Sequence, residues 1–230
     1  EDCLLLLADA PRYAPLLAAA WQPQHDPASH IPFRLVGAGT RTATALATGI
    51  AAVLDAVTGR CDQEALLRVL EHPLVARHYR LDETGHDGAV VLAWLADAGF
   101  RWGLDAGHRA AIQHRDDDRW HLRFALRRLA LGAVVAPADR DRLVDDDVPL
   151  DRASGLDAVL LARLARLAAD LQTTRDEWTA APDTAAGWGE RCRRLVERHL
   201  APGGAADQAH RARLLDRELP ALGRRAPAGA

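Results

Sequence analysis

The pattern of apolar and polar positions divides the chain into a short opening and a long helical remainder. Residues 3–8 read CLLLLA, an apolar run whose length is typical of a strand buried on both faces. Pro11 precedes apolar positions at helical spacing up to Trp21, and residues 31–37 alternate in the manner of a second strand. Strand, helix and strand in this order predict a right-handed crossover between two parallel strands.

Beyond this opening the apolar positions follow helical spacing only. Leu160, Leu164, Leu167 and Leu171 alternate steps of four and three, which predicts a seam for packing another helix. Arg163, Arg166 and Asp170 fall on the outside of that helix. The predicted helices cover residues 46–57, 62–70, 73–79, 90–98 and 119–135, a long helix from about residue 154, and a helix after residue 183 that ends at Gly203.

Local signals fix several boundaries of these elements. Asp62 and Asp183 are each placed to cap a helix with a side-chain oxygen. Residues 100–118 are rich in turn-forming residues, and we expect turns there. The predicted fold is mostly α with a small α/β start. We expect an α/β part over residues 1–60, a helical domain over residues 61–222, and a frayed tail over residues 223–230.

The composition is that of a globular protein without a strong overall charge. Hydrophobic residues make up 49% of the chain, too many for a disordered segment. All 29 basic residues are Arg, because the sequence contains no Lys, and the formal net charge is −3. We therefore expect no overall attraction to nucleic acid or anionic lipid, so that any such contact has to be a local patch.

Cysteine usage and the absence of Met add three expectations. Cys3, Cys61 and Cys192 are far apart and belong to no paired motif, so we expect reduced thiols in a cytoplasmic protein. No apolar run approaches the roughly 18–20 residues of a membrane span, and we expect no membrane contact. The sequence contains no Met, and we expect it to be an internal piece of a longer protein.

Two patterns bear on cofactor binding, and neither supports it. Gly37-Ala38-Gly39 follows a predicted strand, but the third position of a dinucleotide fingerprint falls on Thr42, and no strand with an acidic end follows about 20 residues later. We interpret these glycines as a turn, and an oxidoreductase stays open as an alternative that rests on Gly37 and Gly39 alone. Without Lys the chain cannot form the lysine-bearing loop that holds nucleotide phosphates, so we expect no independent ATP hydrolysis.

Histidines and two aspartate runs are the candidates for metal chemistry. The histidines match no zinc spacing and have no paired Cys nearby, and we expect no metal site. A two-metal nuclease needs carboxylates that converge from separate rigid elements, whereas consecutive aspartates point in different directions. We therefore interpret both runs as solvated loop tips. The residues concerned are His72, His78, His108, His114 and His121, with Asp116, Asp117 and Asp118 in the first run and Asp145, Asp146 and Asp147 in the second.

A basic and aromatic stretch is the candidate for contact with nucleic acid. Arg119, Arg123 and Arg127 recur every four residues and would form one stripe on a predicted helix, along which a DNA phosphate could lie. Such a stripe is also common on solvated helices, and both interpretations stay open. We expect the neighbouring aromatic residues to pack in the core rather than to stack on bases. They are Trp94, Phe100, Trp102, Trp120 and Phe124.

Four motifs in order resemble RecC, the gamma subunit of bacterial exonuclease V. Residues 100–105, FRWGLD, resemble an IRWGID-type signature of that family and follow a WLADAG-like helix end. Residues 120–132, WHLRFALRRLALG, resemble its TWRFGLxRLLLGY stretch. Residues 66–76 and 154–156 resemble two further segments, LLDVPVLA and SSGL. The resemblance covers nearly the whole chain and is weakest over residues 203–230.

The opening resembles the second motor lobe of superfamily-one helicases, which implies part of a RecA-like lobe with two parallel strands. In that lobe the first strand normally ends in a Tyr-Arg-Thr-Asn-like motif. Here the stretch reads Leu7-Ala8-Asp9-Ala10, so that Ala stands in place of the motif's Arg. This departure implies lost motor chemistry, with the helical remainder as an all-helical insertion domain.

The resemblance implies a non-catalytic, helicase-like scaffold that joins RecB-like and RecD-like subunits and positions DNA. The parent complex would be exodeoxyribonuclease V, an ATP-dependent helicase and nuclease that processes double-strand breaks for homologous recombination. None of the family's Chi-reading or strand-splitting residues maps onto this chain, so we assign no catalytic, cofactor, metal or DNA-binding residue. The alternative from another class is a helical regulatory or adaptor domain with no DNA role.

Overall fold

The computed structural model divides into two compact units, Glu1–Thr44 and Ala45–Ala230. The predicted strands over residues 3–8 and 31–37 lie outside the residues that the structure describes, as does the helix between them apart from Tyr13. The units separate at Thr44, whereas the sequence predicts a domain boundary at residue 60. The described residues are Tyr13, 44–113, 118–135, 143–144, 146–150, 157–181 and 184–221.

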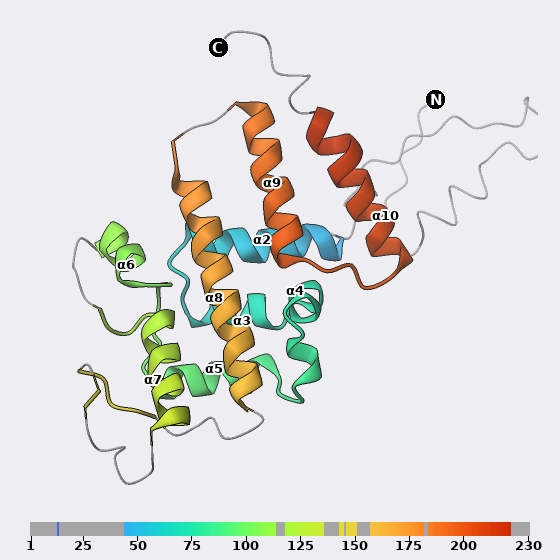
Figure 1. Ribbon diagram of the computed structural model, residues 1–230. Coiled ribbons are helices and arrows are strands. Elements are labelled where there is room, and N and C mark those ends of the chain that lie inside the picture. Colours follow the sequence, from blue (N-terminus) through green and yellow to red (C-terminus); the bar gives the residue numbers. More distant parts are fainter. Residues whose placement is uncertain are drawn as a thin grey trace, which may run out of the picture. The chain divides into compact units, whose positions relative to one another are not determined.

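The second unit is helical, which confirms the prediction of a mostly α protein (Figure 1). No strand occurs within the described ranges of the chain. No helix in those ranges is long and apolar enough to cross a membrane. The elements are α2 (Ala45–Thr58), α3 (Gln63–Leu70), α4 (Pro73–His78), the 3-10 turn η2 (Leu81–Glu83), α5 (Gly88–Asp97), α6 (Ala106–Gln113), α7 (Leu122–Val134), α8 (Asp157–Thr179), α9 (Ala185–His199), α10 (Ala205–Arg213) and the π-helical turn η4 (Leu214–Glu218).

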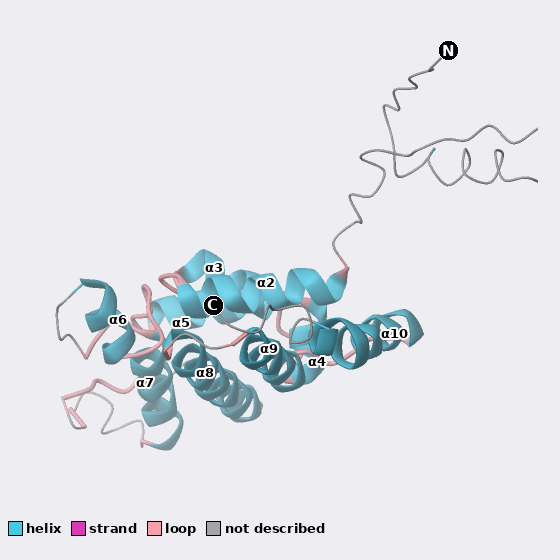
Figure 2. Cartoon of the chain, turned by 90° about the horizontal axis from the view of Figure 1, so that it is seen from above, coloured by secondary structure: helices cyan, strands magenta, loops and turns pink. Residues whose placement is uncertain are grey.

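The long helix α8 is the centre of this unit, and it packs against α2, α7 and α9. In Figure 1, α8, α9 and α10 stand side by side and α2 crosses them. Figure 2, which views the unit from above, shows α2 and α3 in a second layer over these helices. The helix α3 packs against α4 and α5, and α7 packs against both α5 and α8.

The buried seam of α8 is the one that the sequence predicts. Leu160, Leu164, Leu167 and Leu171 are each at most 5% exposed, and they face the common hydrophobic core. Arg166 lies on the outside as predicted, with a side chain 65% exposed, whereas Arg163 and Asp170 are only partly exposed. The Arg163 side chain is 20% exposed and donates to Glu83, and Asp170 accepts a hydrogen bond from Tyr79, so both sides of the seam bind neighbouring elements.

The ends of α3 and α9 differ in how well the sequence locates them. Asp62 caps α3, because its Oδ1 accepts a hydrogen bond from the backbone N–H of Ala65 at 2.9 Å. The predicted cap Asp183 lies outside the described residues, and Thr184 caps α9 instead, with its hydroxyl oxygen accepting from the N–H of Gly187 at 3.1 Å. The helix ends at His199, before Gly203, because Leu200 already has an extended backbone.

Two helices in the middle of the chain begin where the sequence does not place them. The helix α5 starts two residues early, because Oδ1 of Asp87 accepts from the N–H of Val90 at 2.7 Å. The helix α6 falls in the stretch predicted to be turns, and that prediction is wrong for residues 106–113. Asp105 caps α6 by accepting from the N–H of His108 at 2.8 Å. Gly103 and Gly107 lie on either side of this cap, and their low helix propensity explains why the sequence does not predict a helix here.

Candidate functional site

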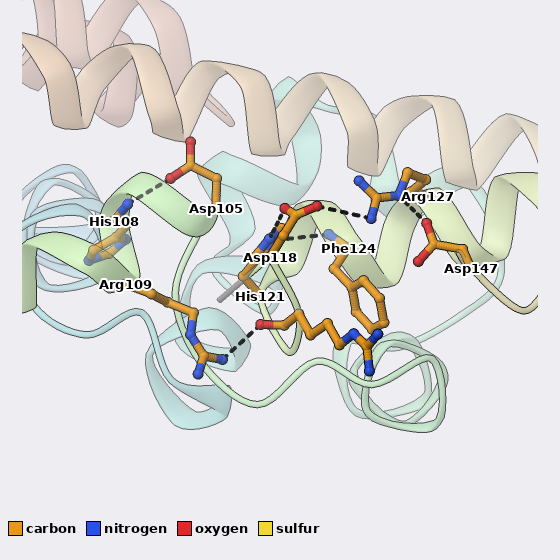
Figure 3. Close-up of polar contacts among 9 residues, drawn as sticks. Asp105, His108, Arg109, Asp118, His121, Phe124, Arg127 and Asp147 are labelled. Atoms are coloured by element: carbon orange, nitrogen blue, oxygen red, sulfur yellow. Dashed lines mark hydrogen bonds and ion pairs between the residues drawn. The ribbon is translucent and has the colours of Figure 1, made fainter. Parts of the chain in front are cut away.

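The two clearest motif segments meet at one corner of the helical unit, which we call the signature corner. It comprises residues 59–62 after α2, residues 100–109 from the end of α5 into α6, and residues 118–124 at the start of α7. An isolated β-bridge joins Asp62 to Trp102 across it. Figure 3 shows that its polar side chains contact one another and the neighbouring backbone.

Gly103 is the residue through which the three segments of the corner are joined. Its N–H donates to the carbonyl oxygens of Arg60 and Cys61, at 2.9 and 3.0 Å. Its own carbonyl oxygen accepts from the N–H of Leu122, at 2.9 Å. Gly103 therefore binds both the turn after α2 and the first turn of α7, and the N–H of Arg123 adds a hydrogen bond to the carbonyl oxygen of Leu104 at 3.0 Å.

Only glycine suits this position. Gly103 has a φ of +88°, in the left-handed region that side-chain-bearing residues rarely adopt. A Cβ atom there would lie 2.6 Å from Cγ of Arg109. Both the backbone conformation and the close approach of Arg109 thus explain the glycine of the motif.

Trp102 fills the space beside this turn and is held by cations on two sides. Its side chain is 9% exposed. The guanidinium of Arg60 lies 4.6 Å from the ring centroid and that of Arg109 lies 4.7 Å from it. Arg109 also donates to the carbonyl oxygen of Arg119 at 2.9 Å, which fixes the approach to α7. These cation–π contacts bind the corner together rather than leaving the tryptophan open to a ligand.

His108 is buried and acts as a structural connector. Its Nδ1 accepts from the N–H of Leu104 at 3.2 Å, and its Nε2 lies 2.9 Å from the carbonyl oxygen of Gly59. This pattern requires the proton on Nε2, which donates to Gly59. Burial, and then the charge of Arg175, lowers the pKa of His108. The neutral ring therefore links α6 to the end of α2.

His121 performs the same kind of task at the start of α7. It is 1% exposed, and its Nδ1 caps the helix by accepting from the N–H of Phe124 at 2.9 Å. Its Nε2 donates to Oδ1 of Asp118 at 3.1 Å. Burial lowers the pKa of His121, although the hydrogen bond to Asp118 opposes this change. The neutral ring therefore holds the aspartate against the helix start.

Arg127 binds one aspartate of each run, Asp118 and Asp147, whereas Asp146 is exposed as predicted. Its Nε donates to Asp147, and its NH2 lies 3.4 Å from Oδ2 of Asp118 (Figure 3). Asp147 is 4% exposed, so the prediction of a solvated loop tip is wrong for this residue. Asp116, Asp117 and Asp145 lie outside the described residues. The ion pair between Arg127 and Asp147 therefore holds the loop after α7 against that helix.

The predicted basic stripe on one helix is not formed. Arg119 precedes the helix, because Trp120 has a φ of +68° and α7 begins only at Leu122. Arg127 is neutralised by two carboxylates. Arg123 alone of the three is an exposed helical arginine without an ion pair among the described residues.

The aromatic residues pack in the core as predicted, with one exception. Phe100 is fully buried and Phe124 is 7% exposed. Trp94 is partly buried and packs against the core. Trp120, in contrast, is 43% exposed, and the guanidinium of Arg101 lies 5.8 Å from its ring centroid. Its carbonyl oxygen accepts from the N–H of Arg101 at 2.8 Å, which holds the left-handed turn in place.

Sequence reasoning missed a second buried polar cluster, which joins α4, α8 and α9. It contains Tyr79, Asp170, Thr174, Arg198 and His199. The signal was available, because His199 follows Leu195 by four positions and Val196 by three and so falls on the apolar face of α9. A polar residue at such a position has to find buried partners.

A family model described as the fourth domain of the RecBCD enzyme subunit RecC matches residues 43–229. The chain belongs to the RecC family. It is also 25% identical to the RecBCD enzyme subunit RecC of Escherichia coli (strain K12) over 176 residues. The aligned part covers 76% of this chain and about 15% of the length of that protein.

The signature corner is formed by two of the segments that resemble RecC motifs. Its FRWGLD segment and the WHLRFALRRL segment both serve internal contacts. Arg101, Trp120, Arg123 and the paired Arg127 are their exposed residues. The third motif segment forms α3 and α4, and the fourth, at residues 154–156, lies outside the described residues. Gly37, Gly39 and Thr42 also lie outside them, as does His114. Within the described ranges, no three His, Cys, Asp or Glu side chains are grouped in a manner that would hold a metal ion.

Proposed function

We propose that the chain is a non-catalytic, helicase-like scaffold region of a RecC-like exonuclease V gamma subunit. In this role it supports DNA unwinding and double-strand break processing for homologous recombination, together with RecB-like and RecD-like subunits. The observation that carries the proposal is the match of the RecC fourth-domain model to residues 43–229. The inactive RecA-like second lobe predicted over residues 1–60 is proposed to end at Thr44, because α2 packs within the helical unit. The helical insertion is proposed to run to residue 222, and residues 223–230 to be a frayed tail.

The chemistry of the signature corner supports a scaffold role. His108 and His121 use both ring nitrogens for hydrogen bonds, and burial keeps both rings neutral. The charge of Arg127 is shared between two carboxylates. A general acid or base needs a lone pair or proton directed at a substrate, and these groups have already used theirs on the protein. The parent complex is therefore proposed to obtain its turnover from other subunits.

DNA contact by this region is proposed to be weak and to involve the exposed part of the corner. Trp120 offers a partly exposed ring, and Arg101 lies over it. Arg123 adds a positive charge on the first turn of α7. Asp118, 66% exposed in its side chain, lies at the same corner and opposes the binding of a polyanion. With two arginines, one exposed aromatic ring and one opposing carboxylate, the corner is suited to guiding DNA that other parts of the complex bind more tightly.

A titration of the chain with forked DNA tests the proposal. We expect dissociation constants of roughly 10⁻⁶–10⁻⁴ M that weaken further as salt is raised, because phosphate neutralisation by arginine releases counterions. The double substitution Arg101→Gln and Arg123→Gln should weaken binding further. Arg217→Gln, which removes an exposed arginine of η4, should not.

Two outcomes of this titration would count against the scaffold. Tight binding that persists at high salt would mean a dedicated DNA-binding domain. Equal effects of the Arg101/Arg123 and Arg217 substitutions would favour the alternative, a helical adaptor with no DNA role.

A further inference from the structure

A pocket of about 250 Å³ opens between α3, α4, η2 and the start of α5, away from the signature corner. Its apolar lining is formed by Leu70, Ala76, Leu81 and Val91. Three of these residues belong to the hydrophobic core, and Ala76 packs against it. Small-molecule sites usually have volumes of roughly 300–1,000 Å³, so this one is of a size to receive a single side chain.

Two carboxylates line the same pocket, and no side chain of the described residues binds either of them. Glu71, at the end of α3, and Asp82, in η2, are both exposed. Neither makes an ion pair or a side-chain hydrogen bond within the described part of the chain, whereas Glu83, next to Asp82, is bound by Arg80 and Arg163. Arg80 and Arg163 thus bind Glu83 directly, and Asp82 acts on Arg80 through its charge alone. His86 lines the pocket as well.

Gly88 allows the Glu71 side chain to lie at the pocket. A Cβ atom on Gly88 would come within 2.6 Å of Cγ of Glu71. Asp87 also lines the pocket, but its Oδ1 is occupied as the cap of α5. The position of Glu71 therefore depends on a glycine at the first residue of α5.

We propose that this pocket receives an arginine side chain of a partner protein. Arginine has a long apolar stem, which would pack against Leu70, Leu81 and Val91, and a planar cation, which would reach Glu71 and Asp82. A purely apolar side chain would leave the two carboxylates without a bound cation, and an anion would be repelled by them. The proposal is independent of the DNA scaffold role, because it concerns a protein partner at a different face.

The experiment uses the 230-residue chain and the peptide acetyl-Gly-Arg-Gly-amide, with binding followed by the NMR amide shifts of Gly88 and Val91. Citrulline in place of arginine keeps the shape of the side chain and removes its charge. We expect a dissociation constant on the order of 1 mM for the arginine peptide, as for other small fragments, and binding about fivefold weaker for the citrulline peptide. Glu71→Gln and Asp82→Asn should each weaken arginine binding about threefold.

Glu64→Gln is the matched control, because Glu64 lies on the same helix, outside the pocket, and pairs with Arg68. It should leave binding unchanged, and thermal melts should show that all variants remain folded. Equal binding of the arginine and citrulline peptides would overturn the proposal. So would tighter binding of a norleucine peptide, which would indicate an apolar occupant, or the absence of shifts at Gly88 and Val91 at about 20 mM peptide.

Discussion

The hydroxyl oxygen of Tyr79 lies 2.9 Å from Nδ1 of His199, and both residues are buried between α4, α8 and α9. The Tyr79 hydroxyl donates to Oδ2 of Asp170, so the histidine must donate to the tyrosine through an Nδ1–H. Its Nε2 then accepts from the hydroxyl of Thr174, at 2.7 Å. The buried imidazole is thus neutral and satisfied on both sides.

This arrangement predicts a pH dependence of stability. Burial, and then the charges of Arg198 and His78, lowers the pKa of His199 to about 3, below the value of about 6.5 expected in the unfolded chain. The unfolded state therefore binds a proton first as the pH falls, so the contribution of His199 is complete above pH ~6.5 and is lost progressively below it. Between pH 7 and pH 5 this loss is about 2 kcal/mol.

Urea unfolding of the His199→Gln variant at several pH values measures this contribution. The free energy of unfolding of the variant should fall less steeply with decreasing pH than that of the unsubstituted chain. His210→Gln is the control, because His210 is exposed on α10, and it should leave the slope unchanged. An unaltered slope in His199→Gln would show that the buried imidazole does not carry the effect.

Gly103→Ala should destabilise the chain by about 2–3 kcal/mol, because it adds both backbone strain and a clash with Arg109. Gly85→Ala separates the two causes. Gly85 has a φ of +74° but nothing within 4 Å of the added Cβ, so its substitution should cost only about 1 kcal/mol. Thermal or urea unfolding compares the two variants. Equal losses would mean that the approach of Arg109 is not tight.

The ion pair of Arg127 with the buried Asp147 should be measurable in a double-mutant cycle. Arg127→Gln leaves a carboxylate that is 4% exposed without its cation, and Asp147→Asn removes that charge again. Because the Arg127 side chain is 41% exposed, solvent screens the interaction, and we expect a coupling free energy of about 1 kcal/mol. Additive losses in the two single variants would indicate that the loop is held by other contacts.

Cys61 should be nearly inert to thiol reagents in the folded chain. It is fully buried, and burial, with a smaller effect of Asp62, raises its pKa to about 12. Cys192 is half-buried, and burial raises its pKa as well. With Cys3→Ser as background, a chain that retains only Cys192 should react with a disulfide reagent at least about tenfold faster than one that retains only Cys61. Similar rates would show that the turn after α2 opens readily.

Helices with regular apolar spacing could be predicted from the sequence, whereas tertiary contacts could not. The seam of α8 and the Asp62 cap depend on local spacing alone, and both predictions are confirmed. The start of α7 depends on Trp120, which has a left-handed backbone. The carbonyl oxygen of Trp120 accepts hydrogen bonds from the N–H groups of Arg101 and Trp102, which are about 20 residues earlier in the sequence. Helix propensity alone would include Trp120 in the helix predicted from residue 119. Its left-handed backbone is set by tertiary contacts at the corner, which the sequence does not show.

The candidate site shows the same division. The motif segments could be recognised from the sequence, and their meeting at one corner could not, because it depends on Gly103 reaching two distant backbones. The arginine stripe failed for the same reason, since the partner of Arg127 comes from a loop 20 residues later. Pairing of charges across a fold is not encoded in helical spacing.

The scaffold proposal is tested most directly by the number of base pairs unwound per ATP hydrolysed in a reconstituted complex. The parent subunit would carry Arg101→Gln, Trp120→Ala and Arg123→Gln, all at exposed positions. We expect subunit assembly and ATP hydrolysis to stay unchanged while the ratio falls several-fold. An unchanged ratio would show that this region has no part in guiding DNA.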